Sequence, residues 1–425
     1  MGQQLGQVVF QKLLSYSTVI IASIITSLSI VLLITIGDFF FEIFNSVKYQ
    51  YWWAPLLWTP IVTVLVVYLL RKIVPDASGT GSPHAIIGTD PKLDESLRNR
   101  FTSVKIAVGK IFFTSGSFLA GLSFGNEGPA VQIGASLMHS ARRWTKYVTA
   151  SSLIMIGNGI GLAVCFGSAM GGILYCAERM SGTFFQTNKV ILGITITIAA
   201  VICLISFGIV PHFGQIVFDP MSWKLLLPTI GIILIGSVVA SMWSQALIYG
   251  FRSDTVISKI KTKNPLWFAF ACATIVAILG LLTYGSINGT SEVATHNMFI
   301  SNYSYWFLPT KFLASMFTAW SGVSAGMFVP MLNMGGGVGA MIADLFGNYS
   351  TSILVVFGMV AFLSAVSRAP LCSCFIVSDA VGNYNLILPM LIISGVSLML
   401  SSKMSPDLWN TQVDMLLTKF NGNVK

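Results

Sequence analysis

Charged residues are scarce in this chain. Asp, Glu, Lys and Arg make up only 9% of its 425 residues and hydrophobic residues make up 54%, with a mean hydropathy of +0.78. This composition excludes an ordinary soluble domain and predicts an integral membrane protein. The apolar stretches lack the alternation of barrel strands, so we expect helices, more than one in the longest stretches. They cover residues 17–36, 53–74, 104–124, 150–177, 188–210, 226–250, 265–285, 306–346 and 350–402.

The sequence also lacks the residue clusters that metal sites and enzymes need. Its four histidines are scattered without metal-ligand spacing, and its six cysteines all lie in apolar stretches, where they behave as small hydrophobic residues. It contains no paired nucleophile and base and no cofactor motif. We therefore expect no metal, no cofactor, no disulfide and no enzymatic activity.

Basic residues outnumber acidic residues by 24 to 15. They gather in short loops, which the positive-inside rule places in the cytoplasm. Membrane orientation therefore explains the excess of basic residues, and we expect no nucleic-acid partner. We expect a multi-pass protein in the lipid bilayer of a bacterial inner membrane, with cytoplasmic termini and the first apolar run retained as a helix. The loop positions are Arg71, Lys72, Lys92, Arg98, Arg100, Lys105, Arg142, Arg143, Lys146, Arg252, Lys259, Lys261 and Lys263.

Acidic residues are rarest inside the apolar stretches. Between Lys110 and Arg142 the only Asp, Glu, Lys or Arg is Glu127, in the sequence GNEGP at 125–129. A lone carboxylate in an apolar segment of membrane length is costly, so it is a candidate functional residue. Glycine and proline break a membrane helix, and broken backbone is tolerated there only inside protein or beside a water-filled cavity. Glu127 is thus predicted to be a gate or a proton carrier on a pathway.

The chain matches itself at a constant offset of 201 residues. Glycine coincidences are expected in a glycine-rich chain, so the lysine, proline and acidic matches carry most of the weight. The register predicts two related halves, residues 1–220 with the N-terminal helix and residues 221–425 with a short C-terminal tail. The matched pairs are Lys110 and Lys311, Gly121 and Gly322, Gly125 and Gly326, Pro129 and Pro330, Gly134 and Gly335, Gly157 and Gly358, and Glu178 and Asp379.

Two helix-breaking loops, 125–129 and 326–330, occupy matched positions, and a third, 79–83, has no counterpart in this register. Matched interruptions indicate a substrate site near the middle of the bilayer. A helix can start at or after each proline, so three helix N-termini would converge, and their free N–H groups bind an anion without a cationic side chain. Glu178 and Asp379 lie at the ends of matched helices and are better explained as caps than as transport residues.

These loops resemble the signature loops of the CLC family of chloride channels and chloride/proton antiporters. The family patterns GSGIP, GREGP and GxFxP correspond to GTGSP at 79–83, GNEGP at 125–129 and GMFVP at 326–330. The segment NYNLILP at 383–389 resembles the one that supplies the family's pore tyrosine. The resemblance implies an all-α polytopic membrane protein with a CLC-type inverted repeat of tilted and broken helices, assembled as a homodimer with one pathway in each subunit.

The resemblance also implies a role for each site residue. Glu127 would be the external gate, whose charged carboxylate competes with chloride and which swings away when it accepts a proton. Hydroxyl and N–H donors bind a halide without a fixed positive charge, so the ion can be released. The anion-binding residues would be Thr80, Gly81, Met327, Phe328 and Tyr384, and the gate-loop backbone would be Gly125, Asn126 and Gly128.

Three residues depart from the family pattern. Thr80 replaces a serine and adds a methyl group that narrows the site, and Asn126 replaces an arginine, which removes positive charge near the outer mouth. Arg179 takes the place of the inner glutamate that relays protons in the antiporters, and an arginine cannot shuttle a proton. Glu178 is a possible substitute. Proton coupling through water and Glu127 alone is a second possibility.

Three functions follow from these residues. The leading interpretation is chloride/proton exchange through Glu127. Arg179 favours the alternative of a passive chloride channel gated by Glu127. A fluoride/proton antiporter is the third alternative. It is suggested by Asn126 and Thr80 but opposed by the presence of Pro129, which keeps the pattern of the chloride-transporting members.

Overall fold

The computed structural model describes residues 2–208, 211–300, 303–347 and 350–421, and this part of the chain is built from helices. The α-helices are α1 (Gly2–Gln50), α2 (Pro55–Ile73), α3 (Ser82–Gly88), α4 (Glu95–Phe101), α5 (Val104–Leu119), α6 (Glu127–Ser140), α7 (Ala150–Phe166), α8 (Ala169–Arg179), α9 (Ser181–Gln186), α10 (Lys189–Phe207), α11 (Leu226–Phe251), α12 (Val256–Lys263), α13 (Pro265–Leu282), α14 (Glu292–Phe299), α15 (Phe307–Ser321), α16 (Phe328–Leu345), α17 (Thr351–Ser367), α18 (Pro370–Val381), α19 (Ile387–Met404) and α20 (Leu408–Asn421). Short 3-10 helices are η1 (Pro75–Ala77), η2 (Ala141–Trp144) and η3 (Trp223–Leu225).

In the described part of the chain, seven helical segments are long and apolar enough to cross a membrane: α1, α2, α10, α11 with η3, α13, α16 and α19. In α16 83% of the apolar window is buried, against 28–39% in the other six. α16 therefore lies in the interior of the protein, whereas the others have faces for lipid. The apolar stretches 306–346 and 350–402 each contain more than one helix, as predicted.

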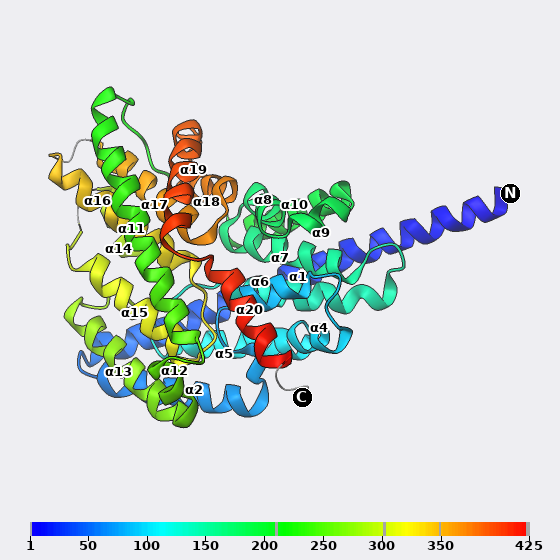
Figure 1. The fold of residues 1–425 in the computed structure, drawn as a ribbon, viewed down its shortest axis with the longest axis horizontal. Helices are drawn as coiled ribbons and strands as arrows, with labels where there is room; N and C mark the ends of the chain where they lie inside the picture. Colours follow the sequence, from blue (N-terminus) through cyan, green and yellow to red (C-terminus); the bar gives the residue numbers. More distant parts are fainter. Residues whose placement is uncertain (1, 209–210, 301–302, 348–349, 422–425) are drawn as a thin grey trace.

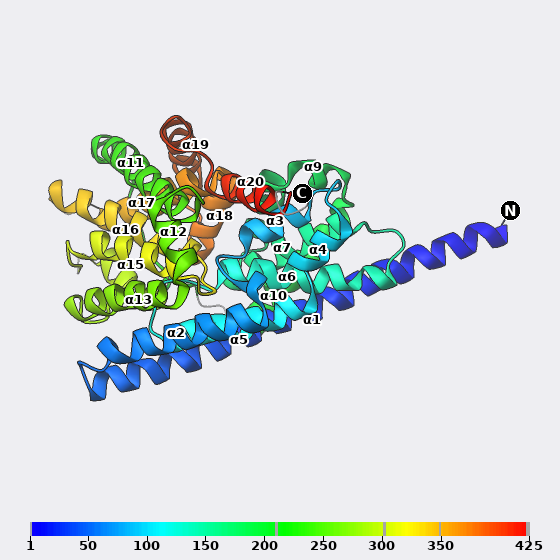
Figure 2. The same ribbon diagram turned by 60° about the horizontal axis from the view of Figure 1, so that its bottom comes forward.

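The first helix is much longer than the apolar run that predicted it. α1 has 49 residues, which is about 74 Å at 1.5 Å per residue. It follows one side of the molecule, and its N-terminal turns extend beyond the other helices (Figures 1 and 2). α5 packs against both α1 and α2, so the first three long helices form one layer along that side (Figure 2).

The repeat seen in the sequence is present in the structure. The starts of α6 and α16, of α7 and α17, and of α8 and α18 are each 201 residues apart. The matched glycines mark helix contacts, because a Cβ atom on Gly335 would lie 2.5 Å from the carbonyl oxygen of Gly358. A Cβ atom on Gly134 would likewise collide with the carbonyl oxygen of Gly157. Close packing of α6 on α7, and of α16 on α17, therefore explains why these four positions match.

The two helix-breaking loops of the 201-residue register cross each other. The N–H of Gly125 donates to the carbonyl of Gly326 at 3.0 Å, and the N–H of Gly326 donates back at 2.9 Å. The two residues form an antiparallel bridge. Reciprocal bonds between equivalent residues are what a two-fold relation between inverted halves requires, so this crossing lies on the axis of the repeat.

The third loop, which has no counterpart in the 201-residue register, has one at a different offset. The N–H of Gly79 donates to Val323 at 2.9 Å, and the N–H of Gly289 donates to Leu122 at 2.8 Å. Leu122 and Val323 are themselves 201 residues apart, which makes Gly289 the equivalent of Gly79. α14 likewise begins 210 residues after α3. Nine additional residues in the second half shift the offset and hide the match in the sequence.

Candidate anion pathway

Glu127 is the first residue of α6, and its side chain is only 3% exposed. Its carboxylate lies against the backbone N–H groups of Val329 and Asn126 and against its own, while Oε2 has no well-oriented hydrogen-bond partner among the described residues. In the described chain no ion pair joins it to a lysine or arginine. Helix N-termini therefore hold this carboxylate as they would hold a free anion.

The loop from the second half supplies the start of α16. Met327 is its N-cap and Phe328 its first residue, and both side chains are buried. The first N–H groups of a helix have no partner within the helix, and the one on Val329 faces the carboxylate of Glu127. α16 has 18 residues, so the positive end of a full helix dipole points at this position.

Thr80 and Gly81 bring the third loop to the same place. Gly81 has φ +87°, which favours glycine, and a Cβ atom there would lie 2.8 Å from the carbonyl oxygen of Gly128. A Cβ atom on Gly128 would collide with the carbonyl oxygen of Thr80. Glycine at both positions thus allows the backbones to touch. The structure brings together all three predicted loops, with the gate loop of Gly125, Asn126 and Gly128 in the middle.

Two fully buried lysines hold these loops from behind. Nζ of Lys110 donates to the carbonyl of Gly79 at 2.7 Å. Nζ of Lys311, 201 residues later, donates to the equivalent carbonyl of Gly289 at 3.2 Å and to Oγ of Ser291 at 2.9 Å. The sequence showed the lysine match without its purpose. The structure shows that each lysine fixes one helix-breaking loop.

Tyr384 does not lie at this site, so its predicted placement is wrong. Its side chain is 47% exposed, and its phenol donates a hydrogen bond to Asp379 near the end of α18. The residue that meets Phe328 from the C-terminal segment is Trp409 in α20, with 4.9 Å between the ring centroids. Trp409 is 1% exposed. The carboxylate of Asp379 and the short turn into α19 hold Tyr384 at the C-terminal end of α18 instead.

α20 was expected to be a short tail, but it closes the site. Asp407 accepts the N–H groups of Trp409 and Asn410, both at 3.0 Å, and so caps the helix. α20 packs against α3 and α11, one helix from each side of the repeat. An aspartate before a helix was a usable signal, but a helix of 14 residues with polar positions does not stand out among membrane spans.

The two residues at the inner proton position are both committed to other partners. Arg179 donates to both carboxylate oxygens of Asp407, at 2.7 and 3.1 Å, and its guanidinium lies 5.4 Å from the ring centroid of Trp409. Glu178 accepts two backbone N–H groups at the start of α18, at 2.8 and 2.9 Å. Glu178 therefore caps a helix in the structure, which is the role that its position at a helix end indicates.

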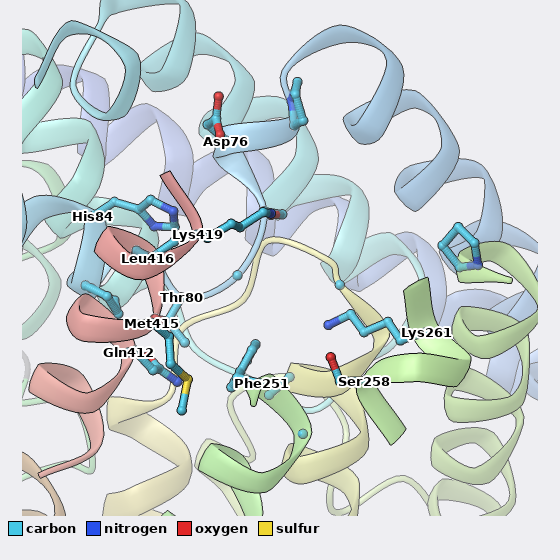
Figure 3. A pocket seen from close by; sticks show the side chains of 18 of the residues that line it. Asp76, Thr80, His84, Phe251, Ser258, Lys261, Gln412, Met415, Leu416 and Lys419 are labelled. Atoms are coloured by element: carbon cyan, nitrogen blue, oxygen red, sulfur yellow. The ribbon is translucent and has the colours of Figure 1, made fainter. Parts of the chain in front are cut away.

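Thr80 is one of the residues that line a cavity of about 470 Å³. In Figure 3 its labelled basic residues, Lys261 from α12 and Lys419 from α20, lie on opposite sides of the opening. Burial first, and then neighbouring positive charge, lowers the pKa of Lys261 to about 8. The lining also contains Arg71, and Arg100 with its ion-pair partner Asp76. Basic groups thus exceed acidic groups, and the cavity attracts anions toward the site.

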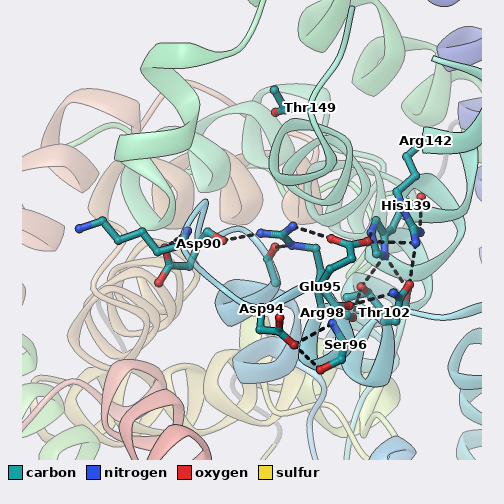
Figure 4. Close-up of polar contacts among 12 residues, drawn as sticks. Asp90, Asp94, Glu95, Ser96, Arg98, Thr102, His139, Arg142 and Thr149 are labelled. Atoms are coloured by element: carbon teal, nitrogen blue, oxygen red, sulfur yellow. Dashed lines mark hydrogen bonds and ion pairs between the residues drawn. The ribbon is translucent and has the colours of Figure 1, made fainter. Parts of the chain in front are cut away.

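A polar cluster fastens the far end of α6 (Figure 4). Glu95 of α4 forms ion pairs with Arg98 at 2.8 Å and with Arg142 at 3.0 Å, and Nε2 of His139 lies 3.5 Å from it. His139 is in the last turn of α6 and Arg142 follows that helix. The cluster therefore fixes the helix whose other end carries Glu127.

The chemistry of the site is that of hydrogen-bond donors and one carboxylate. Among the described residues, no group of three His, Cys, Asp or Glu side chains is placed to hold a metal ion. The donors are backbone N–H groups and hydroxyls, which suit an anion of low charge and allow its release.

Comparison with known proteins gives a consistent set of relatives. A family model described as "Voltage gated chloride channel" matches residues 62–402. Proteins named H(+)/Cl(-) exchange transporter ClcA from Salmonella typhi and from Salmonella newport (strain SL254) are 27% identical over 364 residues, which cover 80% of this chain and 74% of each relative.

Solved structures match over nearly the whole chain. One described as a slow cyanobacterial Cl-/H+ antiporter has a TM-score of 0.80 at 21% identity and covers 97% of this chain and 99% of its own. A CLC-type fluoride/proton antiporter has a TM-score of 0.74 at 20% identity, covering 95% and 98%. Identities this low show the fold alone. The two structural matches confirm the predicted all-helical fold with a CLC-type inverted repeat.

Proposed function

Because the chain belongs to the voltage-gated chloride channel family, we propose that this multi-pass membrane protein exchanges chloride for protons. Glu127 is the external gate and the proton acceptor. The relatives named as exchange transporters support this function. The observation that carries the proposal is the buried carboxylate of Glu127, which lies against helix N-terminal N–H groups and has no ion-pair partner among the described residues.

The geometry supports a simple competition. When Glu127 is charged, its carboxylate takes the donors of Asn126 and Val329 and excludes chloride from them. When Glu127 is protonated, it accepts these N–H bonds more weakly, so chloride can replace it. Each proton that binds Glu127 then frees a place for an anion, and this links the two movements. The remaining proposed anion ligands are Thr80, Gly81, Met327 and Phe328.

A passive chloride channel gated by Glu127 is the second candidate. It is favoured by Arg179, whose ion pair with Asp407 occupies the inner position where a proton relay is expected. In a channel, Glu127 would open the pathway without carrying protons across. In the exchanger, water together with Glu127 must complete the proton route, since Glu178 is held by the start of α18.

The test is uphill transport in sealed liposomes that contain the purified protein. A chloride gradient with the voltage clamped by valinomycin and potassium should drive protons against their own gradient if the protein is an exchanger. Chloride flux with a reversal potential at the chloride Nernst value and no proton movement would reject exchange and leave the channel. Replacing chloride with fluoride in the same assay tests the fluoride alternative, which predicts that only fluoride drives protons.

Location and assembly are part of the proposal. The Salmonella relatives and the basic loops support a bacterial inner membrane with those loops and both termini in the cytoplasm. A homodimer would be built by apolar faces such as those of α10 and α19, where Ile205, Leu388 and Ile392 are exposed. The halves 1–220 and 221–425 remain the proposed limits of the repeat. Single-molecule photobleaching of labelled protein in liposomes tests the dimer, which predicts two steps per particle.

A further inference from the structure

The cavity that Thr80 helps to line is far larger than one chloride ion. Its volume of about 470 Å³ lies within the range of sites that bind small organic molecules, about 300–1,000 Å³. Its walls come from both halves of the chain, from α2 and α3 in the first half and from α11, α12 and α20 in the second. The cavity therefore has room for an organic molecule beside Thr80.

One face of α12 is directed into this cavity. Ser258, Lys261 and Thr262 are three and four residues apart, so they share a helix face, and all three line the cavity. In Figure 3 the side chain of Lys261 points into the open space. The other two lysines of α12, Lys259 and Lys263, are exposed and are not among the described residues that line the cavity. The lining face of α12 thus carries one ammonium group next to a hydroxyl group.

Cations from three helices surround the same space. Arg71 in the last turn of α2 and Lys419 in the last turn of α20 line the cavity together with Lys261. Burial first, and then the positive charges of Arg71 and Lys419, lower the pKa of Lys261 to about 8. Asp76, the one acidic residue of the described lining, is bonded to Arg100 at 2.9 Å. The cavity therefore holds several cations that repel one another.

This charge suits a ligand with more than one negative charge. Among the described residues, no carboxylate forms an ion pair with Arg71 or Lys261. Chloride has a single charge and can offset only one cation. A phosphate group on an organic molecule carries a charge of about −1.5 to −2 and has three oxygens that accept hydrogen bonds from lysine and arginine. Phosphate chemistry thus matches the cations of this cavity better than a halide does.

An apolar wall lies beside these cations. Phe251, the last residue of α11, lines the cavity together with Met415 and Leu416 of α20 (Figure 3). Nζ of Lys261 lies 5.2 Å from the ring centroid of Phe251, so charged and apolar surfaces adjoin. Apolar walls with a few placed polar groups are typical of sites for small organic ligands. An inorganic anion would leave this wall uncovered.

We propose that the cavity binds an organic phosphate, a molecule with phosphate groups on an apolar body, and that this molecule blocks the anion pathway. Its phosphate groups pair with Lys261, Arg71 and Lys419, and its apolar body covers Phe251. Because Thr80 lines the same cavity, the bound molecule lies in front of the anion site. The inference goes beyond the proposed function, since it applies equally to an exchanger and to a channel.

A nucleotide and the headgroup of an anionic phospholipid share this chemistry. The positive-inside rule places the basic loops around the cavity in the cytoplasm, where nucleotides are dissolved and where the membrane leaflet carries anionic lipids. The two sources differ in one measurable respect, because only the lipid competes for the cavity from the bilayer.

The direct test is isothermal titration calorimetry of ATP with the full-length protein purified in detergent. Lys261→Met removes the charge and keeps a long apolar side chain, and the loss of one charge-assisted hydrogen bond should raise the ATP Kd about 10-fold. Arg71→Met should have the same effect from α2. Lys259→Met is the matched control, because it removes the same charge from the same helix outside the cavity, and its Kd should stay within about twofold of the wild type. Tripolyphosphate, which lacks the nucleoside, should bind about 10-fold more weakly than ATP because it leaves the apolar wall uncovered.

Two further measurements give the source of the phosphate and its effect. ATP is titrated into the protein in nanodiscs of phosphatidylcholine, with and without phosphatidylglycerol. If phosphatidylglycerol weakens ATP binding more in the wild type than in Lys261→Met, the lipid headgroup occupies the cavity; if it weakens both equally or not at all, the ligand is soluble. In liposomes with ATP on both sides, chloride flux should slow in the wild type and in Lys259→Met at ATP concentrations that leave Lys261→Met unaffected.

The other results would contradict the inference. Absence of ATP binding to the wild type, or wild-type ATP affinity in both Lys261→Met and Arg71→Met, would overturn it. An equal loss of affinity in Lys259→Met would also overturn it, because net charge and not the cavity would then attract ATP. Equal affinity for tripolyphosphate and ATP would rule out an organic ligand, and ATP binding without slowed chloride flux would rule out the block. Failure of the wild type to move protons uphill would reject exchange, yet it would leave the calorimetric result with ATP unaffected.

Discussion

Replacing Gly326 with alanine should separate the two loops that hold Glu127. A Cβ atom at this position would lie 2.5 Å from the carbonyl oxygen of Gly125, whereas ordinary contact begins at 3.4 Å, so the backbones must part by about 0.9 Å. The reciprocal hydrogen bonds of 2.9 and 3.0 Å would then exceed bonding distance. Two backbone hydrogen bonds at about 0.5–1.5 kcal/mol each give a loss of about 1–3 kcal/mol.

The same displacement moves the start of α16 away from the anion, so chloride affinity should fall together with stability. Thermal unfolding of the detergent-purified protein, with and without chloride, measures both effects. Gly395→Ala in α19 is the matched control, because a Cβ atom there meets nothing within 4 Å and alanine favours a helix interior by about 0.5–1 kcal/mol. If Gly326→Ala melted at the wild-type temperature and kept the same chloride-induced shift, the crossing loops would not be what positions the site.

Two further predictions concern charged groups on the same pathway. Arg179→Gln should lower the free energy of unfolding by about 1–3 kcal/mol, because Asp407 is only 22% exposed and loses its cation. Arg252→Gln is the control, because it breaks an exposed ion pair and should have no measurable effect. Equal melting temperatures of the two variants would contradict the prediction. Since burial lowers the pKa of Lys261 to about 8, Lys261 is charged below that pH and neutral above it. Chloride flux from the cavity side, measured in Glu127→Gln liposomes to remove gating by protons, should fall as pH rises through about 8. Lys261→Met should be slow throughout, and a flat profile with Lys261 present would count against the basic cavity.

The sequence predicted the site best where chemistry is expressed by local pattern. A lone glutamate between glycine and proline is costly in a membrane, so Glu127 could be identified before its surroundings were known. The loops at 125–129 and 326–330 were found because the repeat preserves both breakers. The loops can touch because glycine has no Cβ atom, which leaves room only for the backbone of the facing loop. The structure shows those glycines in contact with the carbonyl groups of the facing loops.

The parts that the sequence did not show depend on tertiary packing. Tyr384 lies in a motif-like segment, but the carboxylate of Asp379 and the turn into α19 hold it away from Phe328. Trp409 reaches the site because α20 folds back against α3 and α11, and a 14-residue helix is not recognisable as part of a membrane core by hydropathy. The equivalence of Gly79 and Gly289 was hidden by nine additional residues, which a search at one fixed offset cannot follow.

The central claim is that one carboxylate, that of Glu127, both gates the anion pathway and carries the proton. Its most direct test compares wild type, Glu127→Gln and Glu178→Gln in liposomes with chloride flux and proton flux recorded together. Exchange through Glu127 predicts that Glu127→Gln keeps chloride flux, independent of pH, and loses all uphill proton movement, whereas Glu178→Gln keeps both. Uphill proton movement that persists in Glu127→Gln would contradict the account.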